Sequence, residues 1–140
     1  MVILGIGNPL RGDDGFGPAL IERLQGRVKA VCLDGGSAPE VYAGKIVKER
    51  PDTILIVDAL HLGRRPGEYE VLRKDEIARM GFSTHDISPN MLLDYLQIET
   101  GAGIYMLGVQ PESLRFGLEL SEPVRQTLKK LEEELISCMS

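Results

Sequence analysis

The chain has 140 residues, enough for one domain with a single hydrophobic core over residues 1–140. Its 43% hydrophobic and 26% charged residues are ordinary for a soluble globular protein, and a net charge of −5 argues against binding to nucleic acid. No apolar run approaches the roughly 20 residues that a membrane-spanning helix needs, so we also expect no membrane association.

The first half of the chain alternates between strand and helix patterns. Phe16, Leu20 and Leu24 recur every four residues, which is typical of the buried face of a helix. Residues 53–57 form the clearest strand, because they are mainly apolar and β-branched. In chain order we predict a strand over residues 2–6, a helix over 14–24, a strand over 30–33, a helix over 39–50 and a strand over 53–57.

Two helix starts mark the second half of the chain. Ser88 followed by Pro89 favours a start because serine caps helices and proline suits the first helical position, and Ser121 opens a similar pattern. We predict an edge strand over residues 69–72, a helix over 75–80, a helix from 88, a strand over 104–109 and a helix from 121. The expected buried faces of the last two helices are Met91, Leu92, Tyr95 and Leu96, and Val124, Leu128, Leu131 and Leu135.

The alternation predicts an α/β fold: a three-layer αβα sandwich around a mainly parallel sheet of about five strands. Ligands of such sheets bind beyond the carboxyl ends of the strands. The residues expected there are Asp13 and Asp14 after the first strand, Asp34 at the end of the second, Asp58 at the end of the third, and His85 in the loop before the proline-started helix.

The first residues of the chain and its two cysteines indicate the cellular compartment in which the protein is found. Met1 leads directly into an apolar run with no basic region before it, so we expect no targeting segment. Cys32 and Cys138 lie far apart, and we interpret Cys32 as a core residue. These features predict a reduced, cytoplasmic protein.

The turn after the first strand has some features of a dinucleotide-binding loop. Gly5 and Gly7 supply two of its glycines, but Leu10 stands where the third should be. Asp13 and Asp14, at the start of the next helix, would repel a pyrophosphate. The Gly-Lys-Ser/Thr sequence of a P-loop does not follow either, so we set nucleotide binding aside.

Asp14, Asp58 and His85 form the set with the most definite chemistry. Asp58 follows an apolar strand, and a buried carboxylate needs a partner or a metal ion. His85 precedes a helix start, whose positive end favours the neutral imidazole that metal binding requires. Two carboxylates and an imidazole suit a divalent transition metal with open positions. Helix capping by Asp13 or Asp14 is the alternative, and His61 is a loop residue or a second ligand.

The same positions carry a resemblance to a known family, in blocks that span nearly the whole chain. The blocks are Gly5-x-Gly7-Asn8-x-Leu10-x-x-Asp13-Asp14-x-x-Gly17, Leu33-Asp34-Gly35-Gly36-Ser37, Ile56-Val57-Asp58-Ala59, Ser83-Thr84-His85, and Gly108-Val109-Gln110-Pro111-Glu112 followed by Phe116-Gly117. As a set they resemble the hydrogenase maturation endopeptidases. The last block, and aspartate at position 14 where many members have glutamate, are similar to the hydrogenase 3, formate-hydrogenlyase, subgroup.

The resemblance implies a cytoplasmic endopeptidase that removes the C-terminal extension of the NiFe-hydrogenase large-subunit precursor after nickel insertion. The family's nickel-contacting residues fall on Asp14, Asp58 and His85, which are then also the catalytic residues. Asn8 and Asp34 are candidate contacts to these ligands or to the substrate backbone, with turn hydrogen bonding as an equal alternative. We expect the nickel to arrive inside the precursor and the enzyme to be a monomer.

The chemical step and two rival functions stay open at this stage. Nickel would polarise the scissile carbonyl or lower the pKa of a bound water. No Ser-His-Asp or Cys-His set indicates a covalent nucleophile, so we expect direct attack by water. Residues 62–66 and 75–83 flank the predicted site and are candidates for gripping the substrate. The rivals are a phosphoreceiver-like signalling module, which would need a lysine after Val109, and a nickel carrier without enzymatic activity.

Overall fold

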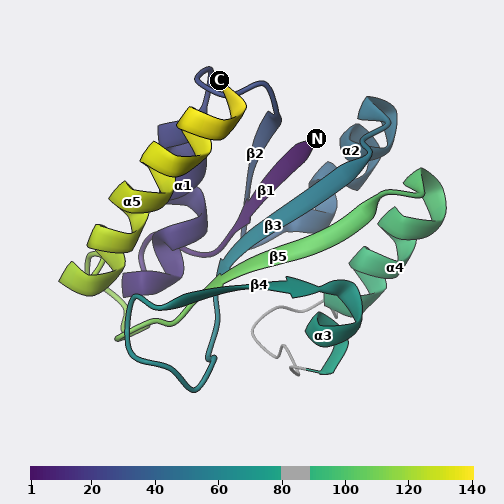
Figure 1. The fold of residues 1–140 in the computed structure, drawn as a ribbon. Coiled ribbons are helices and arrows are strands. Elements are labelled where there is room, and N and C mark those ends of the chain that lie inside the picture. Colours follow the sequence, from purple (N-terminus) through teal and green to yellow (C-terminus); the bar gives the residue numbers. More distant parts are fainter. Residues whose placement is uncertain (80–88) are drawn as a thin grey trace.

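The chain folds around a five-stranded sheet (Figure 1). The computed structural model describes residues 1–79 and 89–140. In chain order its elements are β1 (Val2–Ile6), the 3-10 helix η1 (Gly12–Gly15), α1 (Phe16–Leu24), β2 (Val31–Gly36), the 3-10 helix η2 (Pro39–Tyr42), α2 (Ala43–Glu49), β3 (Thr53–Ala59), β4 (Tyr69–Arg73), α3 (Lys74–Arg79), α4 (Pro89–Thr100), β5 (Gly103–Val109) and α5 (Glu122–Met139). The strand order is β2-β1-β3-β5-β4, with only β4 antiparallel to its neighbour.

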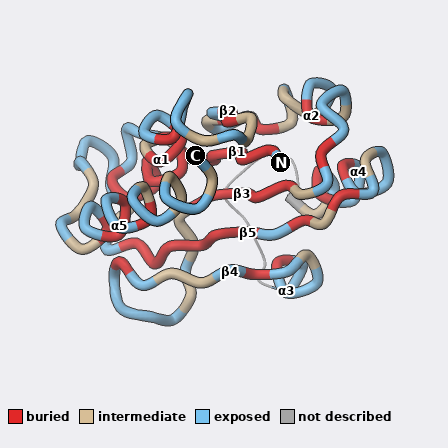
Figure 2. Tube along the Cα trace, turned by 45° about the horizontal axis from the view of Figure 1, so that its top comes forward, coloured by how far each residue is buried: buried red, intermediate tan, exposed pale blue. Residues whose placement is uncertain are grey.

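Helices lie against both faces of the sheet (Figure 1). α1 and α5 bury one face, where Phe16, Leu20 and Leu24 are fully buried and Cys32 joins the same cluster, as predicted. α2, α3 and α4 bury the other face. Because successive strand residues point to opposite faces, a central strand must be apolar throughout, and Val2–Ile6 is wholly buried. Figure 2 shows the buried stretches running through the central strands.

The predicted α/β fold, with a mostly parallel sheet and an edge strand near residues 69–72, is confirmed. The ends of several elements differ from the prediction. β2 and β3 continue to Gly36 and Ala59, so Asp34 and Asp58 lie inside their strands and not beyond them. The predicted helices over residues 14–24 and 39–50 each begin with a 3-10 turn, which is common at helix N-termini.

The buried face of α4 differs from the prediction. Leu92, Leu93 and Leu96 are buried, whereas Met91 is 68% and Tyr95 46% exposed. The sequence of this helix offers two adjoining apolar faces, and packing against the sheet selects the one centred between Leu92 and Leu93. Ser88, its predicted cap, lies outside the described residues. On α5 the predicted face is observed, and it comprises the buried Val124, Leu128 and Leu131 and the partly buried Leu135.

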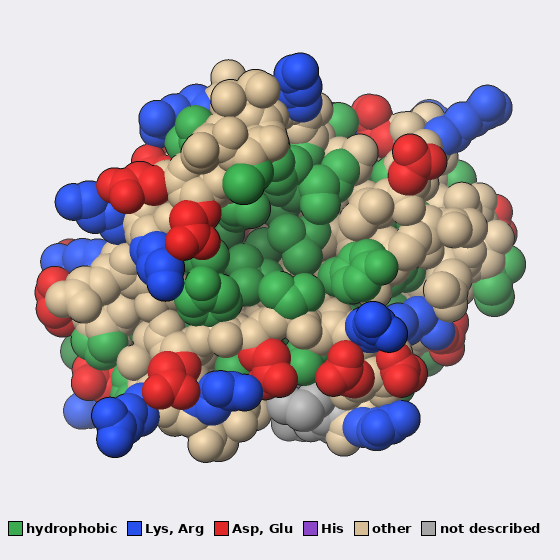
Figure 3. Space-filling model, in the orientation of Figure 1, with side chains coloured by type: hydrophobic (Ala, Val, Ile, Leu, Met, Phe, Trp, Pro, Cys, Tyr) green, Lys and Arg blue, Asp and Glu red, His purple; other side chains and the backbone are tan. Residues whose placement is uncertain are grey.

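The helices leave part of the sheet uncovered. Figure 3 shows hydrophobic side chains gathered in a hollow over the strands that lie between α5 and α4 in Figure 1, with charged side chains around it. Val71 and Tyr105, which lie on the α1 and α5 face by strand register, are 57% and 38% exposed. Within residues 1–79 and 89–140, no helix combines the length and the apolar character that crossing a membrane requires.

Gly17 allows α1 to lie directly on the sheet. A Cβ atom at Gly17 would lie 2.4 Å from the Ile6 carbonyl oxygen and 2.6 Å from the Val57 carbonyl oxygen. Because both are backbone atoms, Gly17→Ala is expected to lower the free energy of unfolding by about 1–3 kcal/mol. Gly44→Ala in α2 is the control, since nothing lies within 4 Å of its Cβ position. Equal urea midpoints for the two variants would contradict the prediction.

Candidate active site

Two of the predicted site residues meet at the edge of the sheet where the parallel strands end. Asp14 lies in η1, which follows β1, and Asp58 is the last residue but one of the neighbouring strand β3. Both residues are buried, with Asp14 8% and Asp58 4% exposed. The charge of Asp14 acts on the pKa of Asp58, so the two carboxyl groups are electrostatically coupled.

Asp58 is in an environment that disfavours its charged form. Burial, and then the negative charge of Asp14, raise its pKa well above the ordinary value, against a smaller opposing effect of a backbone hydrogen bond from Ala59. Among the described residues, no group donates a hydrogen bond to its buried Oδ1 atom. A buried acceptor without a donor among the described residues is suited to bind a cation, or a donor from another part of the chain or from a partner.

Asp14 is positioned by the tight turn that precedes it. Gly7 has a φ of 141°, and a Cβ atom there would lie 1.8 Å from the Asp14 carbonyl oxygen, so this turn requires glycine. The Asn8 N–H donates to Oδ2 of Asp14 at 2.8 Å, and the Asp14 N–H donates to the Arg11 carbonyl at 3.1 Å. The first bond holds the carboxylate of Asp14 and the second holds its backbone, so the turn fixes the position of this residue.

Asp13 has a role that the sequence did not reveal. It is 1% exposed, and it accepts hydrogen bonds from the Glu112 N–H at 2.8 Å, the Ser113 N–H at 3.3 Å, the Ser121 N–H at 2.7 Å and the Ser121 hydroxyl at 2.8 Å. Both aspartates lie in the first turn of η1, but neither η1 nor α1 has a side-chain cap hydrogen bond, so the alternative that Asp13 or Asp14 caps the helix in this way is wrong. Asp13 instead anchors residues 112–121 beside η1, a long-range contact that local sequence patterns do not encode.

Asn8 and Asp34 both make local turn hydrogen bonds. The Asn8 side chain accepts from the Leu10 N–H at 2.9 Å, and the exposed Asp34 carboxylate accepts from the Gly36 N–H at 3.0 Å. The Asn8 backbone N–H also holds Asp14 directly, as described above. A contact of either side chain with substrate stays a prediction.

Gln110 organises the loop that follows Asp58. It is 7% exposed at the end of β5, and its Oε1 atom accepts from the Leu62 N–H at 2.7 Å and the Arg64 N–H at 3.4 Å. Its Nε2 atom lies 3.5 Å from Nδ1 of His61, whose side chain is exposed. A glutamine directly after an apolar strand is the signal for this role in the sequence, but it does not indicate which groups the glutamine would contact.

The third predicted ligand, His85, lies outside the described residues. Within the part of the chain that the structure describes, no three His, Cys, Asp or Glu side chains gather as a metal-binding group. The described part of the site therefore consists of the carboxyl pair of Asp14 and Asp58. A metal ion at this pair would draw its remaining ligands from elsewhere, either from this chain or from a bound partner.

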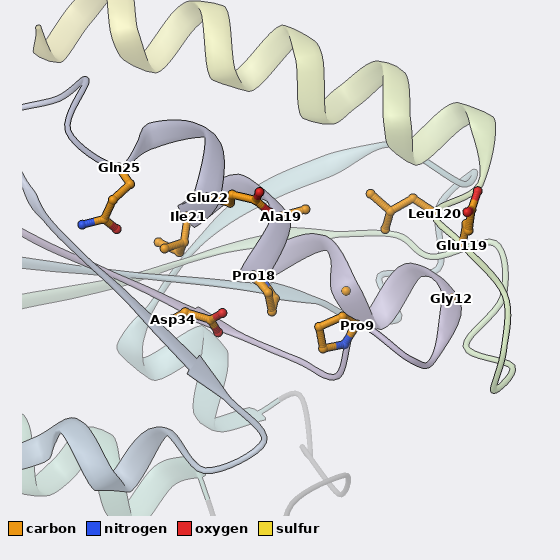
Figure 4. Close-up of a pocket in the computed structure, with 11 residues that line it drawn as sticks. Pro9, Gly12, Pro18, Ala19, Ile21, Glu22, Gln25, Asp34, Glu119 and Leu120 are labelled. Atoms are coloured by element: carbon orange, nitrogen blue, oxygen red, sulfur yellow. The ribbon is translucent and has the colours of Figure 1, made fainter.

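A groove of about 750 Å³ is lined by residues of η1, α1 and the loop before α5 (Figure 4). Pro9, Pro18 and Leu120 supply part of its apolar wall, and the Asp34 carboxylate and Glu119 lie at its margins. Asp14 and Asp58 do not line it. This groove and the carboxyl pair are thus separate features. We centre the candidate site on the carboxyl pair because burial and the charge of Asp14 raise the pKa of Asp58 well above its ordinary value there.

The arrangement has counterparts in known proteins. The chain matches the hydrogenase maturation protease family over residues 18–138. The chain belongs to this family. It is 38% identical over 137 residues to the hydrogenase 3 maturation protease of Escherichia coli strain K12, a match that covers 96% of this chain and 87% of that protein.

Solved structures of members of the family have the same fold. The crystal structure of the NiFe hydrogenase maturation protease HycI from Thermococcus kodakarensis KOD1 matches with a TM-score of 0.89 and 36% identity, covering 97% of this chain and 89% of that one. The solution structure of the endopeptidase HycI from Escherichia coli matches with a TM-score of 0.87 and 36% identity, covering 97% and 88%. The predicted family, subgroup and peptidase activity are confirmed, and the phosphoreceiver and carrier hypotheses are set aside.

Proposed function

We propose that this maturation protease removes the C-terminal extension of the NiFe-hydrogenase large-subunit precursor after nickel insertion, and that it recognises the nickel held in that precursor. Its relatives are a hydrogenase 3 maturation protease and a NiFe hydrogenase maturation protease, which supports the reaction. The nickel-recognition part depends on one observation: Asp58 is buried next to Asp14 with its Oδ1 atom unpaired among the described residues.

The donor set fits a metal that another protein already holds. Asp14 and Asp58 supply carboxylate oxygens, and His85 is the proposed third ligand from this chain. Carboxylate and imidazole ligands suit divalent transition metals, and a set of only three leaves positions that the precursor's own ligands, proposed to be cysteines, fill. Such a half-site binds nickel firmly only when the precursor supplies the other half.

The raised pKa of Asp58 makes recognition conditional on the metal. Without a cation, burial and the charge of Asp14 favour the protonated form of Asp58, which is a poor metal ligand. When a divalent cation is brought to the pair, it favours the carboxylate, and the proton is released to solvent. The nickel supplies Lewis-acid chemistry at the scissile carbonyl or at a water molecule, while Asp14 and Asp58 fix its position.

The proposal is tested by incubating nickel-loaded and nickel-free precursor with the wild type and with Asp14→Ala, Asp58→Ala and His85→Ala. The wild type is expected to cleave only the loaded precursor, and each variant is expected to lose activity by about 100-fold or more, as for loss of a group that acts in the transition state. Equal cleavage of both precursors by the wild type would reject nickel recognition. Full activity in one variant would remove that residue from the site.

The oligomeric state and the cellular compartment of the enzyme are part of the same proposal. We propose that it acts as a monomer in the cytoplasm, where the free thiols of Cys32 and Cys138 stay reduced. Sedimentation of the purified protein at micromolar concentration tests the monomer, and fractionation of cells that express it tests the compartment.

A further inference from the structure

Three hydrophobic side chains are exposed on two loops, one of which leads directly into η1 and Asp14. Leu10 is 60% exposed, Phe116 76% and Leu118 43%. We refer to these three residues as the apolar patch. Single exposed hydrophobic residues are normal on protein surfaces, but a group of them held together marks a binding surface.

Backbone hydrogen bonds hold the two loops of the apolar patch together. The Gly117 N–H donates to the Leu10 carbonyl at 2.7 Å, and the Gly12 N–H donates to the Leu118 carbonyl at 3.0 Å. The loop that carries Leu10 is therefore paired with the loop that carries Phe116 and Leu118. This pairing brings Leu10 close to Phe116 and Leu118, which come more than a hundred residues later in the sequence.

The patch is fixed to the structure by the buried carboxylate of Asp13. This group accepts hydrogen bonds from Glu112, Ser113 and Ser121, which bracket the loop, and the Asp13 N–H donates to the Ser113 carbonyl at 2.9 Å. A loop anchored at both ends does not collapse onto the core to bury its Phe116 side chain. The fold thus keeps an apolar surface in water, which is unfavourable unless a partner covers it.

The position of the patch identifies that partner. Leu10 lies four residues before Asp14 within the same turn, and Asp13, the anchor of the other loop, is adjacent to Asp14. The loops that carry the apolar patch are therefore tied by backbone hydrogen bonds to the turn that holds Asp14. A polypeptide bound at Asp14 and Asp58 would have this turn next to it.

We propose that Leu10, Phe116 and Leu118 bind an apolar segment of the substrate polypeptide that lies next to the scissile bond. This inference rests on the proposed function, because the occupant is the hydrogenase precursor itself. The carboxyl pair then recognises the metal, and the apolar patch recognises the polypeptide around it. The two contacts together fix the bond that is cleaved.

The test measures KM and kcat for nickel-loaded precursor with Phe116→Ser and Leu10→Ser. The matched control is Ile98→Ser, because Ile98 is 80% exposed on α4, near the opposite edge of the sheet where β5 begins. Loss of one buried apolar side chain from the complex is expected to raise KM about 10-fold. We expect kcat to stay within about 2-fold, because the variants leave the carboxyl pair intact.

The outcomes separate this inference from the function on which it depends. A wild type that does not cleave the loaded precursor rejects the proposed function, and the inference with it. A wild type that cleaves it, with both patch variants at wild-type KM, rejects only the apolar patch. An equal rise in KM for Ile98→Ser would also reject it, because the effect would not depend on position. Thermal unfolding within about 2 °C of the wild type, as expected for exposed positions, verifies that the variants fold.

Discussion

Asparagine in place of Asp58 is expected to abolish cleavage of the precursor and to make the protein more stable. The wild-type carboxyl group is buried beside Asp14, and Oδ1 has no donor among the described residues. Asparagine has a similar shape and no charge, so the free energy of unfolding at neutral pH should rise by about 1 kcal/mol. Processing of nickel-loaded precursor should fall by about 100-fold or more, because a neutral amide is a poor ligand.

The pH dependence of stability tests the physical cause of this effect. Burial and the charge of Asp14 raise the pKa of Asp58 in the folded protein, so the folded state binds this proton more tightly than the unfolded chain. The stability that this proton contributes is fully present below the unfolded pKa of about 3.9, and it is lost as the pH rises through the folded pKa. The melting temperature of the metal-free wild type should therefore fall relative to Asp58→Asn as the pH rises above about 4. If the melting temperatures of the two proteins change with pH in the same way, the pKa of Asp58 is not raised in the folded protein.

Replacing Asp13 with alanine is expected to cause the largest loss of stability among the acidic residues of this edge. The substitution removes an acceptor that four hydrogen bonds share, and it leaves the N–H groups of Glu112, Ser113 and Ser121 without their partner. We expect the free energy of unfolding to fall by about 3–5 kcal/mol. Urea denaturation measures the change.

Two further variants give this prediction its controls. Ser121→Ala removes only the hydroxyl donor to Asp13 and should cost about 1 kcal/mol. Asp34→Ala removes an exposed carboxylate with one local turn contact and should stay within about 0.5 kcal/mol of the wild type. An Asp13→Ala protein that is as stable as Asp34→Ala would mean that residues 112–121 do not depend on the anchor.

Much of the fold was predictable because its signals are local. The apolar run over residues 2–6 and the four-residue spacing of Phe16, Leu20 and Leu24 are properties of short segments, and the structure confirms both. The position of Asp14 and Asp58 at one edge followed from the parallel topology, in which the strands end on the same side. The residues of α4 show the limit, since the spacing of apolar residues predicted that Met91 would be buried, whereas packing against the sheet buries Leu93 and leaves Met91 exposed.

The sequence by itself determined the family and the order of strands and helices, and it pointed to the acidic residues that we propose for the site, because each depends on residue types at fixed spacing along the chain. Only the tertiary structure decided which groups surround each of the two adjacent carboxylates, Asp13 and Asp14. Asp13 and Asp14 are adjacent in the chain, yet one is saturated with donors from residues 112–121 while the other faces Asp58. The physical reason is that the pKa and the hydrogen bonding of a carboxyl group depend on burial and on partners distant in sequence. Those partners are brought into place only when the chain folds.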